Sequence, residues 1–367
     1  MNQNKTTSRE PLFHVVKRPE RSGRQMLLFR LGAVALSILA GGLFILAIGY
    51  NPIEIYGTIL NGAFRSKIAV QSTIKITIPL CISALGATLA FKMKFWNIGG
   101  EGQIIMGGVF ATYFALFHAD WPHLPLMIVC FLAGLIGGGL WGLIPALFKV
   151  KWNTNETLLT LMLNYIALYI ISWLQNGPWR DPTANGFPKI AAFAKNAVLG
   201  KVLGVQAGWI VMLVLTVLVW VYLKFTKQGY EVAVVGESQD TARYAGIHVK
   251  KVILRTMFLS GAIGGVCGML QACGTDATLS TGIAGGVGFT AIIVAWLCQL
   301  NPGMILVVSF LFGVLEKGSG VVQSSYGLST DCAAVLQGII LFFILASEFF
   351  VRYAFAGRSS AKGGKKA

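Results

Sequence analysis

The segment Thr226–Lys251, TKQGYEVAVVGESQDTARYAGIHVKK, is polar and basic, and long apolar runs lie on both sides of it. Ser238 can accept a hydrogen bond from a free backbone N–H at a helix start, and Asp240 suits the positive helix end. Gly246 can adopt the left-handed conformation that ends helices. These signals predict a helix over residues 239–245. Because a helix of about two turns is unstable alone in water, we expect a partner protein to bind it. The alternative is an ordinary connecting loop with one ordered turn.

The composition indicates a membrane protein. Of the 367 residues, 55% are hydrophobic and 12% are charged, whereas globular proteins carry about 25% charged residues. The net charge of +16 comes from basic residues at the ends of apolar runs, so nucleic acid is not an expected partner. The six cysteines lie in or beside apolar runs without metal-type spacing and are expected to pack as small apolar side chains rather than form disulfides. They are Cys81, Cys130, Cys267, Cys273, Cys298 and Cys332.

The apolar runs predict ten membrane spans, since about 20 apolar residues cross the hydrocarbon core. They lie at about residues 28–50, 73–91, 98–117, 125–148, 157–175, 208–225, 252–271, 286–300, 303–320 and 332–350, and the eighth is short. The predicted fold is an all-α polytopic domain over residues 28–350. A tail over residues 1–27 is expected to be disordered or to lie on the membrane surface, and a basic tail covers residues 351–367.

The distribution of basic residues predicts the orientation. An even number of spans places both termini on one side, and that side collects 22 of the 30 Lys and Arg residues, against seven on the other. Because basic residues are retained in the cytoplasm, both termini and the 226–251 loop are predicted to be cytoplasmic. The chain is therefore expected to be a multi-pass protein of the cell (inner) membrane.

Two predicted spans are rich in glycine, which lets helix backbones approach closely in lipid. The pattern predicts a tightly packed bundle, as in a transporter, although close packing alone also explains it. These glycines are Gly134, Gly137, Gly138, Gly139 and Gly142 in the fourth span and Gly261, Gly264, Gly265 and Gly268 in the seventh.

Polar residues inside spans are costly and often functional, so each exception is a candidate for a solute pathway. The first stretch is NIGGEGQ, residues 97–103, in which Asn97 is placed to cap the third span and Glu101 falls in its first turn. Glu101 is either a capping acid or, with Gln103, part of a glycine-flanked backbone break beside a pathway. The three glycines around one acid favour the pathway, for which Asn97, Glu101 and Gln103 are candidate residues.

A second polar stretch runs from Asn153 into the fifth span. Positions 157, 160 and 164 share a helical face, which gives this span a polar stripe. Glu156, Thr160 and Asn164 are candidate pathway residues, although the stripe also suits hydrogen bonds between helices. A third stretch, residues 275–278, lies in a glycine-rich outer connection.

The longest external loop, residues 176–207, contains Pro178, Pro182 and Pro188. Proline stiffens the loop, so Trp179, Arg180 and Asp181 are candidate residues for docking a solute-delivery protein. The alternative is a solvated loop.

No energy source of its own is visible in the chain. It has no P-loop motif, its four histidines are scattered, and no carboxylate pair suggests a proton relay. No catalytic residue, metal or cofactor is therefore predicted, and the chain is expected to be a transporter subunit rather than an enzyme.

Three stretches resemble the permease subunits of bacterial ABC importers for nucleosides, ribose-type sugars and branched-chain amino acids. Residues 97–103 look like the N-I-G-x-E-G-Q of the nucleoside branch, and residues 155–165 are similar to N-E-x-x-x-T-L-M-L-N-Y. Residues 236–247 resemble the G-E-N-P-x-A-A-R-Y-A-G-I loop that meets the ATPase. This loop departs from the pattern at Ser238-Gln239, in place of Asn-Pro, and at Thr241, in place of alanine, so the helix cap depends on Ser238.

The resemblance implies an importer permease of the larger-bundle, type II-like class that forms half of the path for nucleosides. The implied partners are a homologous second permease in a heterodimer, two ABC ATPase subunits that bind the ATP, and an extracellular solute-binding protein or lipoprotein. The implied ATPase-coupling residues are Gly236, Glu237, Ser238, Ala242, Arg243, Tyr244, Ala245 and Gly246. Two alternatives stay open: the same importer class for a sugar such as ribose or galactose, and a stand-alone secondary transporter or channel.

Overall fold

The computed structural model describes residues 13–17, 23–184, 186–328, 335–336, 338–339, 342–343, 346 and 353–357. The chain divides into two compact units, Thr58–Val322 and a second unit of Met1–Gly57 with Gln323–Ala367.

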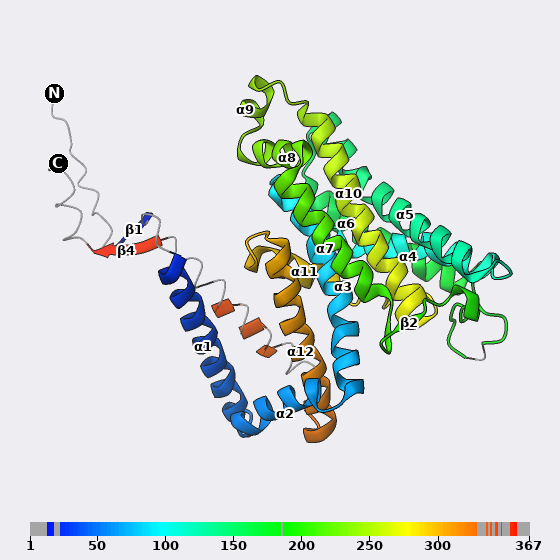
Figure 1. Cartoon of the computed structure of the whole chain (residues 1–367), viewed down its shortest axis with the longest axis horizontal. Helices are drawn as coiled ribbons and strands as arrows, with labels where there is room; N and C mark the ends of the chain where they lie inside the picture. Colours follow the sequence, from blue (N-terminus) through cyan, green and yellow to red (C-terminus); the bar gives the residue numbers. More distant parts are fainter. Residues whose placement is uncertain are drawn as a thin grey trace, which may run out of the picture. The chain divides into compact units, whose positions relative to one another are not determined.

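The unit Thr58–Val322 is built from long helices joined by short ones (Figure 1). The long helices are α3 (Lys67–Lys92), α4 (Gly100–Phe117), α5 (His123–Trp152), α6 (Glu156–Asn176), α7 (Gly208–Phe225) and α10 (Val249–Leu270), which continues into a π-helical turn, η2 (Gln271–Asp276). The shorter elements are α8 (Lys227–Glu237), α9 (Gln239–Tyr244), α11 (Val287–Leu297), η1 (Lys195–Ala197), β2 (Lys201–Val202) and β3 (Val205–Gln206). Helices α2 (Pro52–Phe64) and α12 (Pro302–Tyr326) belong partly to each unit.

Six of the helices found in the described residues are long and apolar enough to cross a membrane: α3, α5, α6, α7, α10 with η2, and α12. A seventh span results if Ala35–Ala47 and Pro52–Phe64, which meet at 113°, are counted as one broken span. The polytopic all-α fold is thus confirmed, whereas the number of ten spans is not. Helix α4 has Glu101 and Gln103 in its first turn, and α11 has only 11 residues. Most of the predicted last span, residues 332–350, lies outside the described residues.

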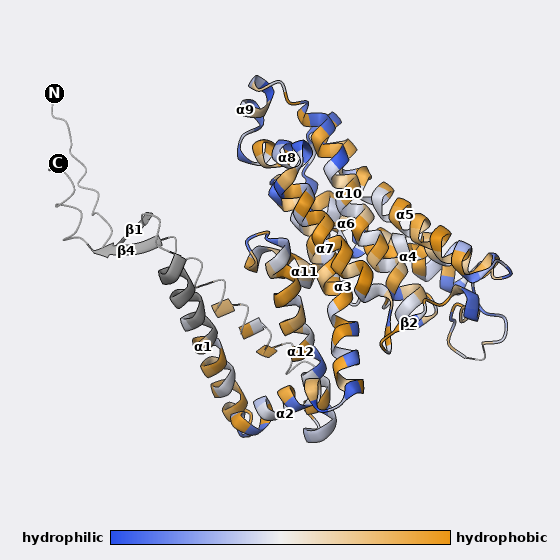
Figure 2. Ribbon diagram, viewed as in Figure 1, coloured by the Kyte–Doolittle hydropathy of each residue, from blue (hydrophilic) through white to orange (hydrophobic). Residues whose placement is uncertain are grey.

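Glycines hold α4, α5 and α10 in close contact, which confirms the predicted tight packing. A Cβ atom added at Gly138 would overlap the backbone of Gly261 and lie 2.5 Å from the Cα of Gly265. A Cβ atom at Gly107 would overlap the backbone of Gly265 as well. In Figure 2 the helices of this bundle are mostly hydrophobic, and hydrophilic residues gather around α8 and α9.

The segment between α7 and α10 contains two helices rather than the one predicted. Helix α9 confirms the prediction, because the Ser238 hydroxyl accepts from the Thr241 N–H at 3.2 Å and Gly246 has φ +75°. Helix α8 was not predicted, and Gly236 and Glu237 lie in its last turn. The two helices share an apolar cluster with α5, α10, the end of α3 and the chain after it. Its members are Ala90, Met93, Phe95, Ala146, Val232, Val235, Ala242, Val249, Val252, Ile253 and Met257.

The second unit contains α1 (Gly23–Ala47) and a two-stranded sheet. Strand β1 (Phe13–Lys17) pairs antiparallel with β4 (Tyr353–Gly357), so that Phe13 lies opposite Gly357. In the first tail, where the sequence predicted disorder or a surface location, residues 13–17 form a strand and residues 23–27 begin α1, and in the last tail residues 353–357 form a strand. The rest of both tails lies outside the described residues.

Candidate functional site

The candidate site contains two buried side-chain amides that bond to each other. Asn97 lies in the irregular chain between α3 and α4, and Gln103 lies in the first turn of α4. The Asn97 Nδ2 donates to Gln103 Oε1 at 3.3 Å, and the Gln103 Nε2 donates back to Asn97 Oδ1 at 3.2 Å. Both side chains are 3% exposed. Asn97 does not occupy the N-cap position that the sequence suggested, because α4 begins at Gly100 and Gly99 is its N-cap. The Asn97 amide instead accepts from the Gly99 N–H at 3.0 Å.

The N-terminus of α4 has no side-chain cap from its own N-cap residue, Gly99, and the polar stripe of α6 caps it instead. The Asn164 Oδ1 accepts from the Gly102 N–H, in the first turn of α4, at 2.8 Å, and its Nδ2 donates to the Ile98 carbonyl at 2.9 Å. The Thr160 hydroxyl accepts from the Ile98 N–H at 3.2 Å. The two polar stretches that the sequence singled out therefore meet, and a side chain of one helix satisfies the free backbone groups at the start of another.

Glu101 caps a helix other than its own. Its carboxylate accepts from the Gly286 N–H at 2.7 Å and from the Gly288 N–H at 2.8 Å, at the N-terminus of α11. A negative charge is stabilised there by the free N–H groups and the helix dipole. A Cβ at Gly288 would overlap Glu101, so the start of α4 and the start of α11 are in direct contact.

Ser260 of α10 completes the cluster and was not found from the sequence. Its hydroxyl donates to the Gly86 carbonyl of α3 at 2.7 Å and accepts from Asn97 Nδ2 at 3.4 Å. Serine in a glycine-rich span has no pattern that distinguishes it from a packing residue. The polar cluster, defined as Asn97, Glu101, Gln103, Thr160, Asn164 and Ser260, thus joins α3, α4, α6, α10 and α11.

The polar cluster borders a cavity of about 10 Å³, which holds about one water molecule. Its walls include Asn97, Gln103, Ser260 and Gly288. A cavity of this size admits no organic solute, so passage of a solute here requires α4, α10 or α11 to separate.

Glu156 lies apart from the polar cluster. Its carboxylate forms an ion pair of 2.9 Å with Lys149 at the end of α5, and the two side chains are 15% and 24% exposed. This pair closes the turn from α5 to α6, where Asn155 caps α6 through the Thr157 and Leu158 N–H groups. The structure brings five of the six predicted pathway residues together and separates this one.

Helix α9 presents a small surface. Tyr244 is 94% exposed, and Arg243 forms an exposed ion pair of 3.0 Å with Asp240, one turn before it. The inner face is packed, because Ala242 is fully buried. Gly236 lies against the chain after α3, since an added Cβ would overlap the Lys92 carbonyl oxygen. Of the predicted coupling residues, Glu237, Arg243, Tyr244, Ala245 and Gly246 are exposed, and Arg243 and Tyr244 have the largest side chains among them.

The loop from α6 to α7 is folded onto itself. Trp179 is half-buried against Phe117, with ring centroids 6.1 Å apart, and Arg180 is exposed and pairs with Ile190 in a β-bridge. The Thr183 hydroxyl and N–H donate to Asp181 at 2.7 and 2.9 Å, and these bonds lower the pKa of the Asp181 carboxyl. Phe187 of this loop is 94% exposed. The sequence did not single it out as a candidate docking residue, because a single aromatic residue in a proline-rich loop forms no pattern.

Among the described residues, no group of three His, Cys, Asp or Glu side chains could hold a metal ion. Five of the six cysteines are buried and lie outside any disulfide, as predicted, and Cys332 lies outside the described residues.

Residues 69–345 match the family model described as branched-chain amino acid transport system / permease component. The glucose ABC transporter permease protein of Haloferax volcanii is 30% identical, over 88% of this chain and 89% of that protein. One guanosine ABC transporter permease protein of Bacillus subtilis is 30% identical, over 92% and 97% of the two chains. A second guanosine permease protein of that organism is 26% identical, over 80% and 95%.

Proposed function

Because this chain belongs to the permease-component family of branched-chain amino acid transport systems, and is thus an ABC transporter permease rather than an enzyme, we propose that it imports nucleosides. The observation that carries this solute class is the similarity to a guanosine permease over almost the full length of both chains. The NIGGEGQ stretch at the start of α4, which resembles the nucleoside branch, supports it. A stand-alone secondary transporter does not fit the family.

A simple sugar is the second candidate, and the glucose permease relative favours it. The test is uptake of radiolabelled guanosine, ribose and glucose, measured separately, by vesicles that contain the full complex with its binding protein. Saturable uptake of guanosine alone is expected. Uptake of labelled glucose or ribose, without uptake of guanosine, would assign the chain to a sugar.

The proposed complex contains this chain, a second homologous permease, two ABC ATPase subunits and a solute-binding protein outside the membrane. The two guanosine permeases of Bacillus subtilis support a heterodimer. ATP would be bound by the ATPase subunits, and this chain would use no cofactor.

The proposed topology has ten spans in the larger-bundle class, with both termini in the cytoplasm. The pairing of β1 with β4 supports termini on one side. Helix α4 and the half-length α11 would raise the seven spans to nine, because Glu101 satisfies the start of α11 inside the bundle rather than in water, and the predicted span over residues 332–350 would be the tenth.

Three surfaces have proposed roles. Tyr244 and Arg243 of α9 would enter a cleft on the ATPase, and Trp179, Arg180, Asp181 and Phe187 would meet the binding protein. The polar cluster would open as α4, α10 and α11 separate, so that alternating access exposes its amides to the solute.

A further inference from the structure

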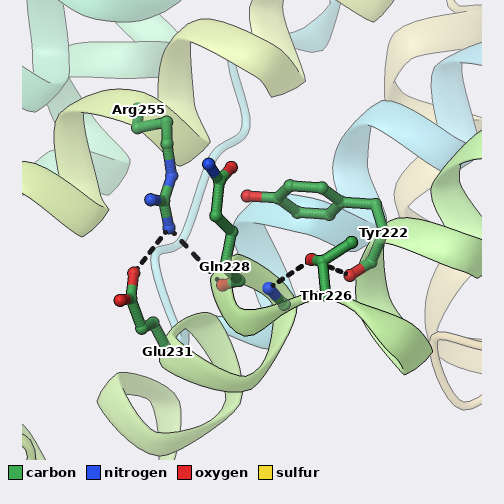
Figure 3. A network of polar contacts seen from close by, with 6 residues as sticks. Tyr222, Thr226, Gln228, Glu231 and Arg255 are labelled. Carbon is green, nitrogen blue, oxygen red and sulfur yellow. Dashed lines mark hydrogen bonds and ion pairs between the residues drawn. The ribbon is translucent and has the colours of Figure 1, made fainter.

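A partly buried ion pair between Arg255 of α10 and Glu231 of α8 joins the two helices (Figure 3). The Arg255 Nη2 donates to Glu231 Oε2 at 3.1 Å and to the Gln228 carbonyl oxygen at 3.4 Å. The side chains of Arg255 and Glu231 are 30% and 18% exposed. A partly buried, hydrogen-bonded ion pair fixes the relative position of two helices more strictly than an exposed pair.

The other contacts of α8 restrain it less specifically. Val232 and Val235 of α8 pack on Val252 and its neighbours in α10 within the shared apolar cluster. Apolar contact is non-directional, so it allows one helix to slide over another. At the start of α8, the Thr226 hydroxyl accepts from the Gly229 N–H at 3.0 Å and donates to the Tyr222 carbonyl at 2.6 Å. These bonds tie α8 to α7, not to α10.

Arg255 also lies close to the polar cluster along α10. Ser260 follows five residues later, about 7.5 Å along the helix axis. Because α10 is a continuous helix between these residues, a displacement applied at Arg255 reaches Ser260, and through it Asn97 and the Gly86 carbonyl.

We propose that the Arg255–Glu231 pair is the link that makes α10 follow α8 and α9. Arg255 is a positioning residue in this role: it contacts neither solute nor ATP, and it converts movement of the docked helix into separation of the polar cluster. The inference rests on the proposed docking of an ATPase at α9.

The experiment uses the full complex in vesicles and measures three quantities: ATPase content by co-purification, solute uptake per complex, and ATP hydrolysed per solute imported. We expect Glu231→Gln and Arg255→Gln each to keep the ATPase but to lower uptake by roughly 5- to 150-fold, the range of coupling between distant sites. ATP hydrolysed per solute should rise accordingly. A purely structural residue would lower uptake only in proportion to assembled complex.

The exchange variant, Glu231→Arg with Arg255→Glu, restores an ion pair between the same positions and is expected to recover uptake. Lys251→Gln is the matched control, because it removes an exposed charge from α10 one turn before Arg255, and it should leave uptake per complex as in the wild type. Unchanged uptake in both single variants would overturn the inference, as would an exchange variant that assembles without transporting. If a single variant fails to assemble, the exchange variant decides. Absence of any ATPase on the wild-type chain would refute the proposed function instead.

Discussion

The carboxylate of Glu101, in the first turn of α4, accepts hydrogen bonds from the backbone of the α11 N-terminus, including one of 2.8 Å from Gly288. The two residues are 187 positions apart in the chain. The bond joins two helices whose separation would widen the cavity beside them. Glu101 therefore caps α11, and its place in the wall of the pathway stays a prediction.

Replacing Glu101 by alanine removes two charge-assisted hydrogen bonds, each worth about 1.5–3 kcal/mol. We expect Glu101→Ala to reduce uptake more than it reduces the amount of assembled complex, and Glu101→Gln, which keeps one acceptor oxygen, to lose less. The measurement is uptake normalised to purified complex. Glu54→Ala is the control, because Glu54 is an exposed acid in the first turn of α2. Uptake that falls only in step with complex would make Glu101 purely structural.

We predict that uptake requires both the acceptor oxygen and the donor nitrogen of the Asn164 side chain. The side chain accepts from Gly102 and donates to the Ile98 carbonyl, so Asn164→Leu leaves two backbone groups unsatisfied, at about 1–3 kcal/mol each. We expect Asn164→Leu to lower uptake more than it lowers the amount of assembled complex. Asn164→Asp, which keeps the acceptor, should have an intermediate effect. Asn176→Ala, at the exposed end of the same helix, is the control. Equal uptake by Asn164→Leu and Asn176→Ala would exclude Asn164 from the pathway.

Local signals predicted the local structure well, and the reasons are physical. The cap at Ser238 and the stop at Gly246 are interactions within a few residues, so the sequence shows them directly. Helix α8 was missed because Gly229 and Gly236 lower its intrinsic helix propensity. Tertiary contacts offset this cost, because Val232 and Val235 pack in the apolar cluster and both glycines lie close to backbone of other parts of the chain, Tyr222 and Lys92 respectively.

The assembly of the polar cluster could be predicted only in part. Periodicity placed Thr160 and Asn164 on one face, and glycines marked Glu101, but neither pattern shows which backbone groups these side chains bind. The contacts join Asn164 to Gly102 across 62 positions and Glu101 to Gly288 across 187. Such pairings depend on the tertiary fold, and Ser260 is recognisable only once α10 lies beside α3.

Close packing of glycine predicts a steric effect at Gly138. A Cβ there would overlap the α10 backbone, and overpacking costs about 1–3 kcal/mol. We expect Gly138→Ala to lower the thermal unfolding midpoint of the detergent-purified complex. Gly57→Ala should leave the midpoint unchanged, because no heavy atom lies within 4 Å of the Cβ position at Gly57. Equal midpoints for the two variants would contradict the packing described for α5 and α10.

The proposed orientation predicts a pattern of thiol labelling. In a background without the six native cysteines, Arg243→Cys should react with an impermeant thiol reagent only after the cells are opened. Arg180→Cys should react in intact cells, because the loop after α6 would be external. Both side chains are exposed, so accessibility within the protein does not limit the reaction. Labelling of Arg243→Cys in intact cells would reverse the orientation.

The last prediction concerns α9 as the docking element for an ATPase. The helix has six residues, too few to be stable in water alone, and its inner face is already held by Ala242 in the apolar cluster. Its outer face offers Tyr244, which provides apolar area with a polar tip, and Arg243, whose exposed pair with Asp240 can be exchanged for an acid of a partner at little cost.

Replacing Arg243 and Tyr244 together by alanine is expected to weaken ATPase association and uptake in parallel. Membrane insertion should not change, because no long helix is altered, and solute binding by the external protein should not change either. The measurement is co-purification of the ATPase, with ATP hydrolysis in reconstituted vesicles. Tyr169→Ala is the control, since Tyr169 is an exposed tyrosine of α6 on a different helix. Because the substitutions leave the Ser238 cap and Gly246 in place, α9 should stay helical. Full retention of the ATPase, with hydrolysis still coupled to transport, would show that the ATPase docks elsewhere.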